Sequence, residues 1–163
     1  MWRVLLWAGL FNAEGTEVAE ALCPMLSEQA YNLVLNTPEG EQLRLEQFKD
    51  NALFINIQAF WCPLCVVEMP TIQKLHVDVS KNDNIRFLMI SLDENQEKAR
   101  KFMEGKDFSI PYYFPVSGLP KIFQSPYIPS TFVISKERQV VYKQEISPIT
   151  GLKKIRFWLT GLS

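Results

Sequence analysis

The chain has 163 residues, a formal net charge of −1, 47% hydrophobic residues and 21% charged residues. This length fits one domain, and the apolar fraction is that of an ordinary globular protein with a hydrophobic core. Acidic and basic residues are interspersed, without the basic stripe of nucleic-acid-binding proteins or the acidic tail of disordered segments. We therefore expect a single domain over residues 1–163 and no nucleic-acid partner.

Residues 1–27 form an N-terminal extension. One Arg precedes an apolar run from Val4 to Phe11, which is far shorter than the ~20 residues that span a bilayer. No A-x-A-like cleavage site of a signal peptide follows it. Three interpretations stay open for this run: a packed helix, a remnant of a targeting or anchoring segment, and a membrane-surface helix. Further on, Thr16 is a candidate N-cap of a short helix that Pro24 would end.

Strand and helix patterns follow in the first half of the chain. Residues 31–35 and 42–45 flank the turn-rich segment NTPEG and predict a β-hairpin. Residues 52–60 are nearly continuously apolar, which is typical of a strand buried on both faces of a sheet. From Pro63 to about Val79 the apolar residues recur at helical spacing.

The second half continues this alternation. The predicted elements are a buried strand (85–91), a helix (93–105), a loop rich in Pro and aromatic residues (110–127), two hairpin strands (131–135 and 140–144) and an amphipathic helix (149–161). Asp93 is the expected N-cap of the helix 93–105, and Gly105 its expected stop. This order predicts an α/β domain with a central mixed sheet and right-handed crossovers.

Two of the three cysteines, Cys62 and Cys65, follow the predicted strand 52–60 directly. A disulfide between them would close a tiny loop and add little stability, which indicates a chemical purpose for the pair. At the N-terminus of the following helix, free N–H groups and the helix dipole favour a thiolate on Cys62. Pro63 suits the first helical turn. Cys65 shares the face of Cys62 and could attack a mixed disulfide formed there.

The segment NIQAFWCPLCVVEMP (56–70) resembles the active-site segment of the thioredoxin superfamily, closest to its TlpA/ResA-like thiol–disulfide oxidoreductases, which are related to AhpC/TSA proteins. The resemblance extends from about Tyr31 to the C-terminus and includes LVLNTPEGEQLRLEQFKD, FLMISLDENQEKARKF and YIPSTFVIS. It implies a thioredoxin-like fold, with a central mixed sheet flanked by helices and an N-terminal β-hairpin. It also implies a protein disulfide oxidoreductase without a cofactor or a metal.

The resemblance also implies roles for individual residues. Cys62 is the expected attacking thiol, Cys65 the resolving thiol and Glu68 the proton acceptor. The residues expected to contact a substrate are Trp61, Pro63, Ile128 and Pro129, the last as a cis-proline, and Pro70 is expected to kink the helix. We expect the partners to be proteins with disulfides or dithiols, together with an external redox partner.

Some positions depart from the family pattern. Asn56 occupies the position where many thioredoxins carry a buried Asp, and an amide cannot titrate, so the proton transfer falls to Glu68. Phe60, Val66 and Val67 make the expected surface around the cysteines unusually apolar, which suits docking of a flexible segment of another protein.

Alternatives remain at this stage. Glu68 could be an ordinary surface glutamate of the helix. Cys23, Cys62, Cys65 and His76 could form a Cys3His zinc set, although Cys23 and His76 stand alone; His76 is more readily a partly exposed helix residue. The chain could bind a metal or client without turnover, or be a thiol peroxidase, although the P-x-x-x-T-x-x-C pattern of peroxiredoxins is missing.

The family implies a location in the bacterial cell envelope or periplasm, with the cytoplasm as the alternative and a membrane anchor lost or absent. For the direction of the reaction, we expect the protein to reduce the disulfides of its partners.

Overall fold

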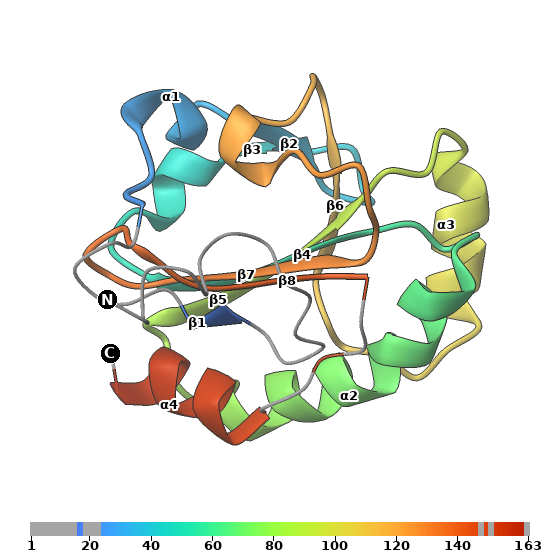
Figure 1. Ribbon diagram of the computed structural model, residues 1–163. Coiled ribbons are helices and arrows are strands. Elements are labelled where there is room, and N and C mark those ends of the chain that lie inside the picture. The colour runs from blue at the N-terminus through green and yellow to red at the C-terminus, as the bar shows by residue number, and fades with distance from the viewer. Residues whose placement is uncertain (1–15, 18–23, 147–148, 150–151, 162–163) are drawn as a thin grey trace.

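The computed structural model describes residues 16–17, 24–146, 149 and 152–161. In this part of the chain, eight strands form one mixed sheet in the order β1-β8-β7-β4-β5-β6-β2-β3 (Figure 1). The strands are β1 (Thr16–Glu17), β2 (Val34–Asn36), β3 (Gln42–Arg44), β4 (Ala52–Gln58), β5 (Ile85–Ser91), β6 (Tyr112–Pro115), β7 (Ser130–Ile134) and β8 (Val140–Glu145). The central strand β4 runs parallel to β5 and antiparallel to β7.

Helices cover both faces of this sheet. They are α1 (Glu28–Tyr31), α2 (Pro63–Val79), α3 (Gln96–Glu104) and α4 (Leu152–Gly161), with the 3-10 turns η3 (Leu45–Phe48) and η4 (Lys121–Phe123). In Figure 1, α2 and α4 lie below the central strands, α1 and the β2–β3 hairpin at the edge of the sheet lie above them, and α3 stands at the right-hand end. The thioredoxin-like α/β fold with an N-terminal hairpin is thereby confirmed.

The alternation of β4 divides the hydrophobic core into two layers. Leu53, Ile55 and Ile57 pack on the α1 side, against residues such as Phe132. Phe54 points the other way, into the layer formed with α2 and α4. Asn56 and Gln58 share the face of Phe54, because side chains alternate along a strand. Two amides, both buried, are therefore directed toward α2 at the end of β4 where the chain enters that helix.

The elements expected from the sequence recur within a few residues, with several differences. Helix α1 was not expected, and Tyr31 ends this helix instead of opening the predicted strand 31–35, which begins at Val34. Thr16 lies in β1 and pairs with Lys143, so its expected role as a helix N-cap is wrong. The N-cap of α3 is Asn95, whose side chain accepts from the Lys98 N–H, and not Asp93. The expected loop 110–127 contains β6, because the aromatic residues there pair with both β5 and β2.

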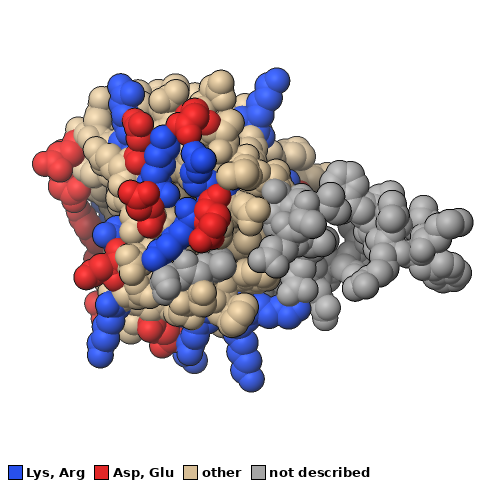
Figure 2. All heavy atoms as spheres, turned by 90° about the vertical axis from the view of Figure 1, so that its left-hand side faces the viewer, with Lys and Arg blue, Asp and Glu red and all other residues tan. Residues whose placement is uncertain are grey.

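The remaining expectations for the N-terminal extension fall on residues 1–15 and 18–23, which include Cys23 and lie outside the described residues. Among the helices described, none is long and apolar enough to cross a membrane. Figure 2 shows the end of the molecule at the left of Figure 1, where acidic and basic side chains lie interspersed. Some of these opposite charges form ion pairs, such as those of Glu28 with Lys49 and with Arg138.

Candidate active site

Cys62 lies at the N-terminus of α2, directly after the turn that leaves β4. It is the N-cap residue: its Sγ accepts a hydrogen bond from the Cys65 N–H at 3.4 Å. Pro63 is the first residue of the helix, where its missing N–H costs nothing. The cap therefore holds the Cys62 sulfur against the free N–H groups of the first turn, as expected from the sequence.

Both cysteines are free thiols, and they differ in access to solvent. Cys62 is 6% exposed and Cys65 1% exposed. The pKa of Cys65 is raised to about 12, chiefly by burial. The neighbouring Cys62 and the charge of Glu68 add to this increase, and a hydrogen bond with the Ala59 backbone opposes it. A buried sulfur that resists ionisation suits the second step of an exchange, after a base has taken its proton.

The turn before β7 lies against the cysteine pair. The Ile128–Pro129 peptide bond is cis, as expected for the resembling segment. The Cys62 Sγ is 4.0 Å from the carbonyl oxygen of Ile128, and the Ile128 side chain packs on the cluster of Ala59, Cys62 and Cys65. Two segments 66 residues apart in sequence thus form one site.

Glu68 is buried beneath this pair, which excludes the surface-glutamate alternative. It is 2% exposed, and its Oε2 accepts from the Asn56 amide at 3.3 Å, while no described group hydrogen-bonds to its Oε1. Burial raises the pKa of Glu68 to about 7, with smaller opposing effects of the Asn56 amide and the Ile149 N–H. A carboxyl group with this pKa can take up or release a proton near neutral pH.

Asp93 is a residue of the site that the sequence assigned to another task. Its carboxylate accepts from the Phe60 N–H at 2.8 Å and from the Ser91 hydroxyl at 2.6 Å. The Phe60 ring packs against Phe102 of α3, with ring centroids 4.9 Å apart, so it contributes less to the exposed rim than expected. Asp93 thereby fastens the turn that carries Trp61 and Cys62 to the end of β5. The signal in the sequence is an acidic residue two positions after a strand, a pattern that also predicts a helix cap.

The surface around Cys62 is apolar. Trp61 is 69% exposed and Val67 67% exposed, and Leu64 and Tyr127 are exposed as well. Pro63 and Pro70 are exposed on α2, whereas Pro129 is buried. Large exposed apolar side chains beside a reactive group mark a surface for another molecule. We call Trp61, Leu64, Val67 and Tyr127 the apolar rim.

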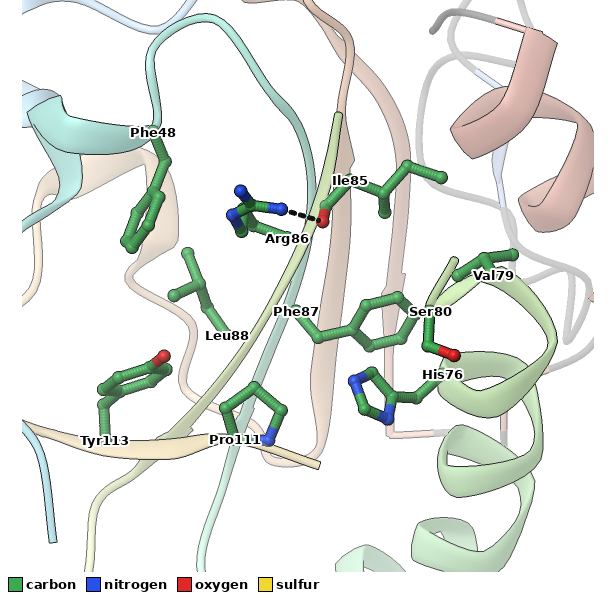
Figure 3. A pocket seen from close by; sticks show the side chains of 10 residues that line it. All are labelled: Phe48, His76, Val79, Ser80, Ile85, Arg86, Phe87, Leu88, Pro111 and Tyr113. Atoms are coloured by element: carbon green, nitrogen blue, oxygen red, sulfur yellow. Dashed lines mark hydrogen bonds between the residues drawn. The ribbon is translucent and has the colours of Figure 1, made fainter. Parts of the chain in front are cut away.

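His76 lies far from this site, at the other end of α2. The eleven residues from Cys65 to His76 correspond to roughly 16 Å of helix. His76 packs edge-on against Phe87 and, as expected, is partly exposed. It lines a hollow of about 300 Å³ at the edge of β5, together with Arg86 and Tyr113 (Figure 3). Among the described residues, no three metal-ligating side chains gather, so His76 and the cysteine pair do not form one metal site.

A family model described as "AhpC/TSA family" matches residues 26–143. The chain belongs to this family. Among its AhpC/TSA relatives, the thiol–disulfide oxidoreductase ResA of Bacillus thuringiensis is 27% identical over 122 residues, covering 74% of this chain and 69% of ResA. These matches confirm the TlpA/ResA-like resemblance.

Solved structures similar to this AhpC/TSA-family chain carry related names. One is a putative thiol–disulfide oxidoreductase of Bacteroides vulgatus, with a TM-score of 0.65 and 22% identity over 80% of this chain and 91% of that one. Another is a secreted thiol–disulfide isomerase of Corynebacterium glutamicum, with a TM-score of 0.65 and 16% identity over 90% of both chains. At these identities the two structures establish the fold.

Proposed function

We propose that the chain is a thiol–disulfide oxidoreductase that reduces disulfides in partner proteins through Cys62 and Cys65. The observation that carries this proposal is the position of Cys62, capping α2 beside the cis Ile128–Pro129 bond, with Cys65 one turn further on. The names of the ResA relative and of the solved neighbours support the same reaction class.

The reaction has two steps. The Cys62 thiolate attacks one sulfur of a partner disulfide, and the other partner sulfur leaves as a thiolate that takes up a proton. The Cys65 thiol then gives its proton to Glu68, and its sulfur attacks Cys62. This step releases the second partner thiol and leaves a Cys62–Cys65 disulfide, so two electrons have passed to the partner. An external dithiol returns the pair to its reduced form.

We propose that the pair donates electrons, and the buried Cys65 thiol is the observation that supports this direction. A strong oxidant stabilises its reduced form by holding a thiolate. Burial of Cys65 opposes a thiolate at that position, so the Cys65 side of the pair adds no such stabilisation. A reductant requires a reduction potential near or below the ~−270 mV of thioredoxin, whereas a potential near the ~−120 mV of a strong periplasmic oxidant would reverse the proposed direction.

The apolar rim is the docking surface in this proposal. Trp61 and Pro63 adjoin Cys62 in the chain, and the Ile128 carbonyl lies 4.0 Å from its sulfur. In the proposal a partner segment lies across these residues and Pro129, with its cysteine at the Cys62 sulfur. The partner is a protein with apolar residues around its disulfide, since Val67 and Trp61 offer no charge to bind. We place the protein in the bacterial cell envelope, supported by its TlpA/ResA-like resemblance and the secreted C. glutamicum neighbour.

Trapping of the mixed disulfide tests this function. In a Cys23→Ser background, Cys65→Ser should accumulate adducts with a disulfide-bonded protein that thiol reductants release, because the resolving sulfur is absent. The matched variant Cys62→Ser should form none. Equal adduct formation by both variants would refute the assigned order of attack. Stoichiometric zinc lost with Cys62→Ser would instead favour a binding module, and peroxide turnover comparable to that of peroxiredoxins would favour a peroxidase.

A further inference from the structure

The Glu68 carboxyl group has an unusual partner. Asn56 of β4 donates its amide to Glu68 Oε2 at 3.3 Å and to the Thr131 hydroxyl oxygen of β7 at 2.9 Å. All three side chains are at most 2% exposed. Thr131 and Asn56 are register partners in the β4–β7 pair, so the sheet itself fixes how the amide meets the hydroxyl. The amide is therefore held from one side and directed at the carboxyl from the other.

The Asn56 amide has both hydrogen-bonding characters. Its nitrogen donates to a carboxylate, and its oxygen could accept from a carboxylic acid. Thr131 matches either orientation, because a hydroxyl accepts from an amide N–H and donates to an amide oxygen. The Asn56 oxygen has no hydrogen-bond partner among the described residues. Rotation of the amide by half a turn therefore exchanges the two hydrogen bonds of its nitrogen for two of its oxygen, and it breaks no existing hydrogen bond of the oxygen.

We propose that Asn56 is a positioning residue that holds Glu68 in both of its charge states, its amide turning over as Glu68 gains and loses a proton. With Glu68 ionised, the amide donates to Glu68 and Thr131. With Glu68 protonated, the amide oxygen accepts from the Glu68 O–H and the Thr131 hydroxyl. This inference rests on the proposed role of Glu68 as the proton acceptor of Cys65.

Among the residues that the structure describes, no charged group acts on the pKa of Glu68. On α2 the titratable neighbours are Cys65 and Cys62, and the charge of Glu68 acts on Cys65. From β4, β7 and the segment before α4, the groups acting on Glu68 or its partner are the Asn56 amide, the Thr131 hydroxyl and the Ile149 N–H, all neutral. Burial and Asn56 therefore dominate the proton affinity of Glu68. An aspartate in place of Asn56 would set a second carboxyl against Glu68, and the two would have to share a proton.

The test follows the two side chains directly by NMR in the Cys62–Cys65 disulfide form, where no thiol of the pair titrates. We expect the Glu68 carboxyl carbon and the Asn56 amide to titrate with one common midpoint. The contact between the Asn56 amide protons and the Thr131 methyl group should be present above the midpoint and lost below it. An Asn56 amide that keeps its contacts across the titration would overturn the inference.

Variants separate positioning from simple packing. Asn56→Leu removes a hydrogen bond from both charge states of Glu68, and the bond to the charged carboxylate is the stronger of the two. The Glu68 midpoint should therefore rise by about one pH unit, a tenfold gain in proton affinity. Thr131→Val should leave the midpoint nearly in place but abolish the common response of Asn56, and Thr131→Ser should restore it. Gln58→Leu is the matched control: Gln58 is a buried β4 amide on the same face without hydrogen-bond partners among the described residues, and its loss should not move the midpoint.

The same variants report on the reaction. In a Cys23→Ser background, the pH profile of Cys65 attack on a preformed mixed disulfide should shift upward with the Glu68 midpoint in Asn56→Leu. If the NMR midpoint moves and the reaction profile does not, Glu68 is not the proton acceptor and the proposed mechanism fails. If neither moves, Asn56 does not position Glu68.

Discussion

Glu68→Gln should make the protein more stable at neutral and alkaline pH. The pKa of Glu68 is raised from 4.5 to about 7 by burial, which corresponds to roughly 3 kcal/mol at 1.36 kcal/mol per pH unit. Below pH 4.5, the folded and unfolded chains both carry the proton, so Glu68 contributes nothing. Between pH 4.5 and 7 the unfolded chain releases the proton while the folded chain keeps it, and the free energy of unfolding falls. Glutamine has no proton to release.

Urea unfolding of the reduced protein at pH 4.5, 6 and 8 measures this effect. The stability of Glu68→Gln relative to the parent should rise by roughly 3 kcal/mol between pH 4.5 and pH 8. The upper limit is pH 8 because free cysteine ionises near 8.5 in an unfolded chain and would add its own contribution. Glu104→Gln is the matched control, since Glu104 is an exposed residue of α3. A relative stability that stays within ~1 kcal/mol across this range would refute the burial argument.

Three further predictions concern the turn, the rim and the core. Asp93→Ala removes the acceptor of the Phe60 N–H and should lower the free energy of unfolding by about 1–3 kcal/mol. Added to Cys65→Ser, it should also slow adduct formation. An unchanged rate would show that Asp93 does not hold the turn. Val67→Glu should leave the melting temperature nearly unchanged, because Val67 is exposed, yet slow the reduction of a partner with apolar residues around its disulfide; equal rates would remove Val67 from the docking surface. Phe132→Ala should cost about 3–5 kcal/mol in chemical denaturation, since Phe132 is fully buried against Phe123; a loss below ~1 kcal/mol would contradict its place in the core.

The amino-acid sequence by itself determined most of the fold. Strand β5 has the predicted bounds, and α2 follows from apolar spacing between Pro63 and Val79, because local periodicity reports which face of an element is buried. The cysteine pair and its cap at a helix N-terminus were also evident, since they depend on neighbours within one turn. The cis-proline segment was predicted from the family resemblance.

Only the tertiary structure decided how the candidate site is built. Asn56 meets Thr131 across 75 residues and Phe60 meets Asp93 across 33, and no local pattern encodes such contacts. The burial of Glu68, which raises its pKa to about 7, depends on the sheet against which α2 packs. Strand β6 was interpreted as a loop because its partners β5 and β2 lie elsewhere in the sequence. A sequence specifies which residues can react, whereas desolvation and hydrogen bonds between distant segments set how they do so.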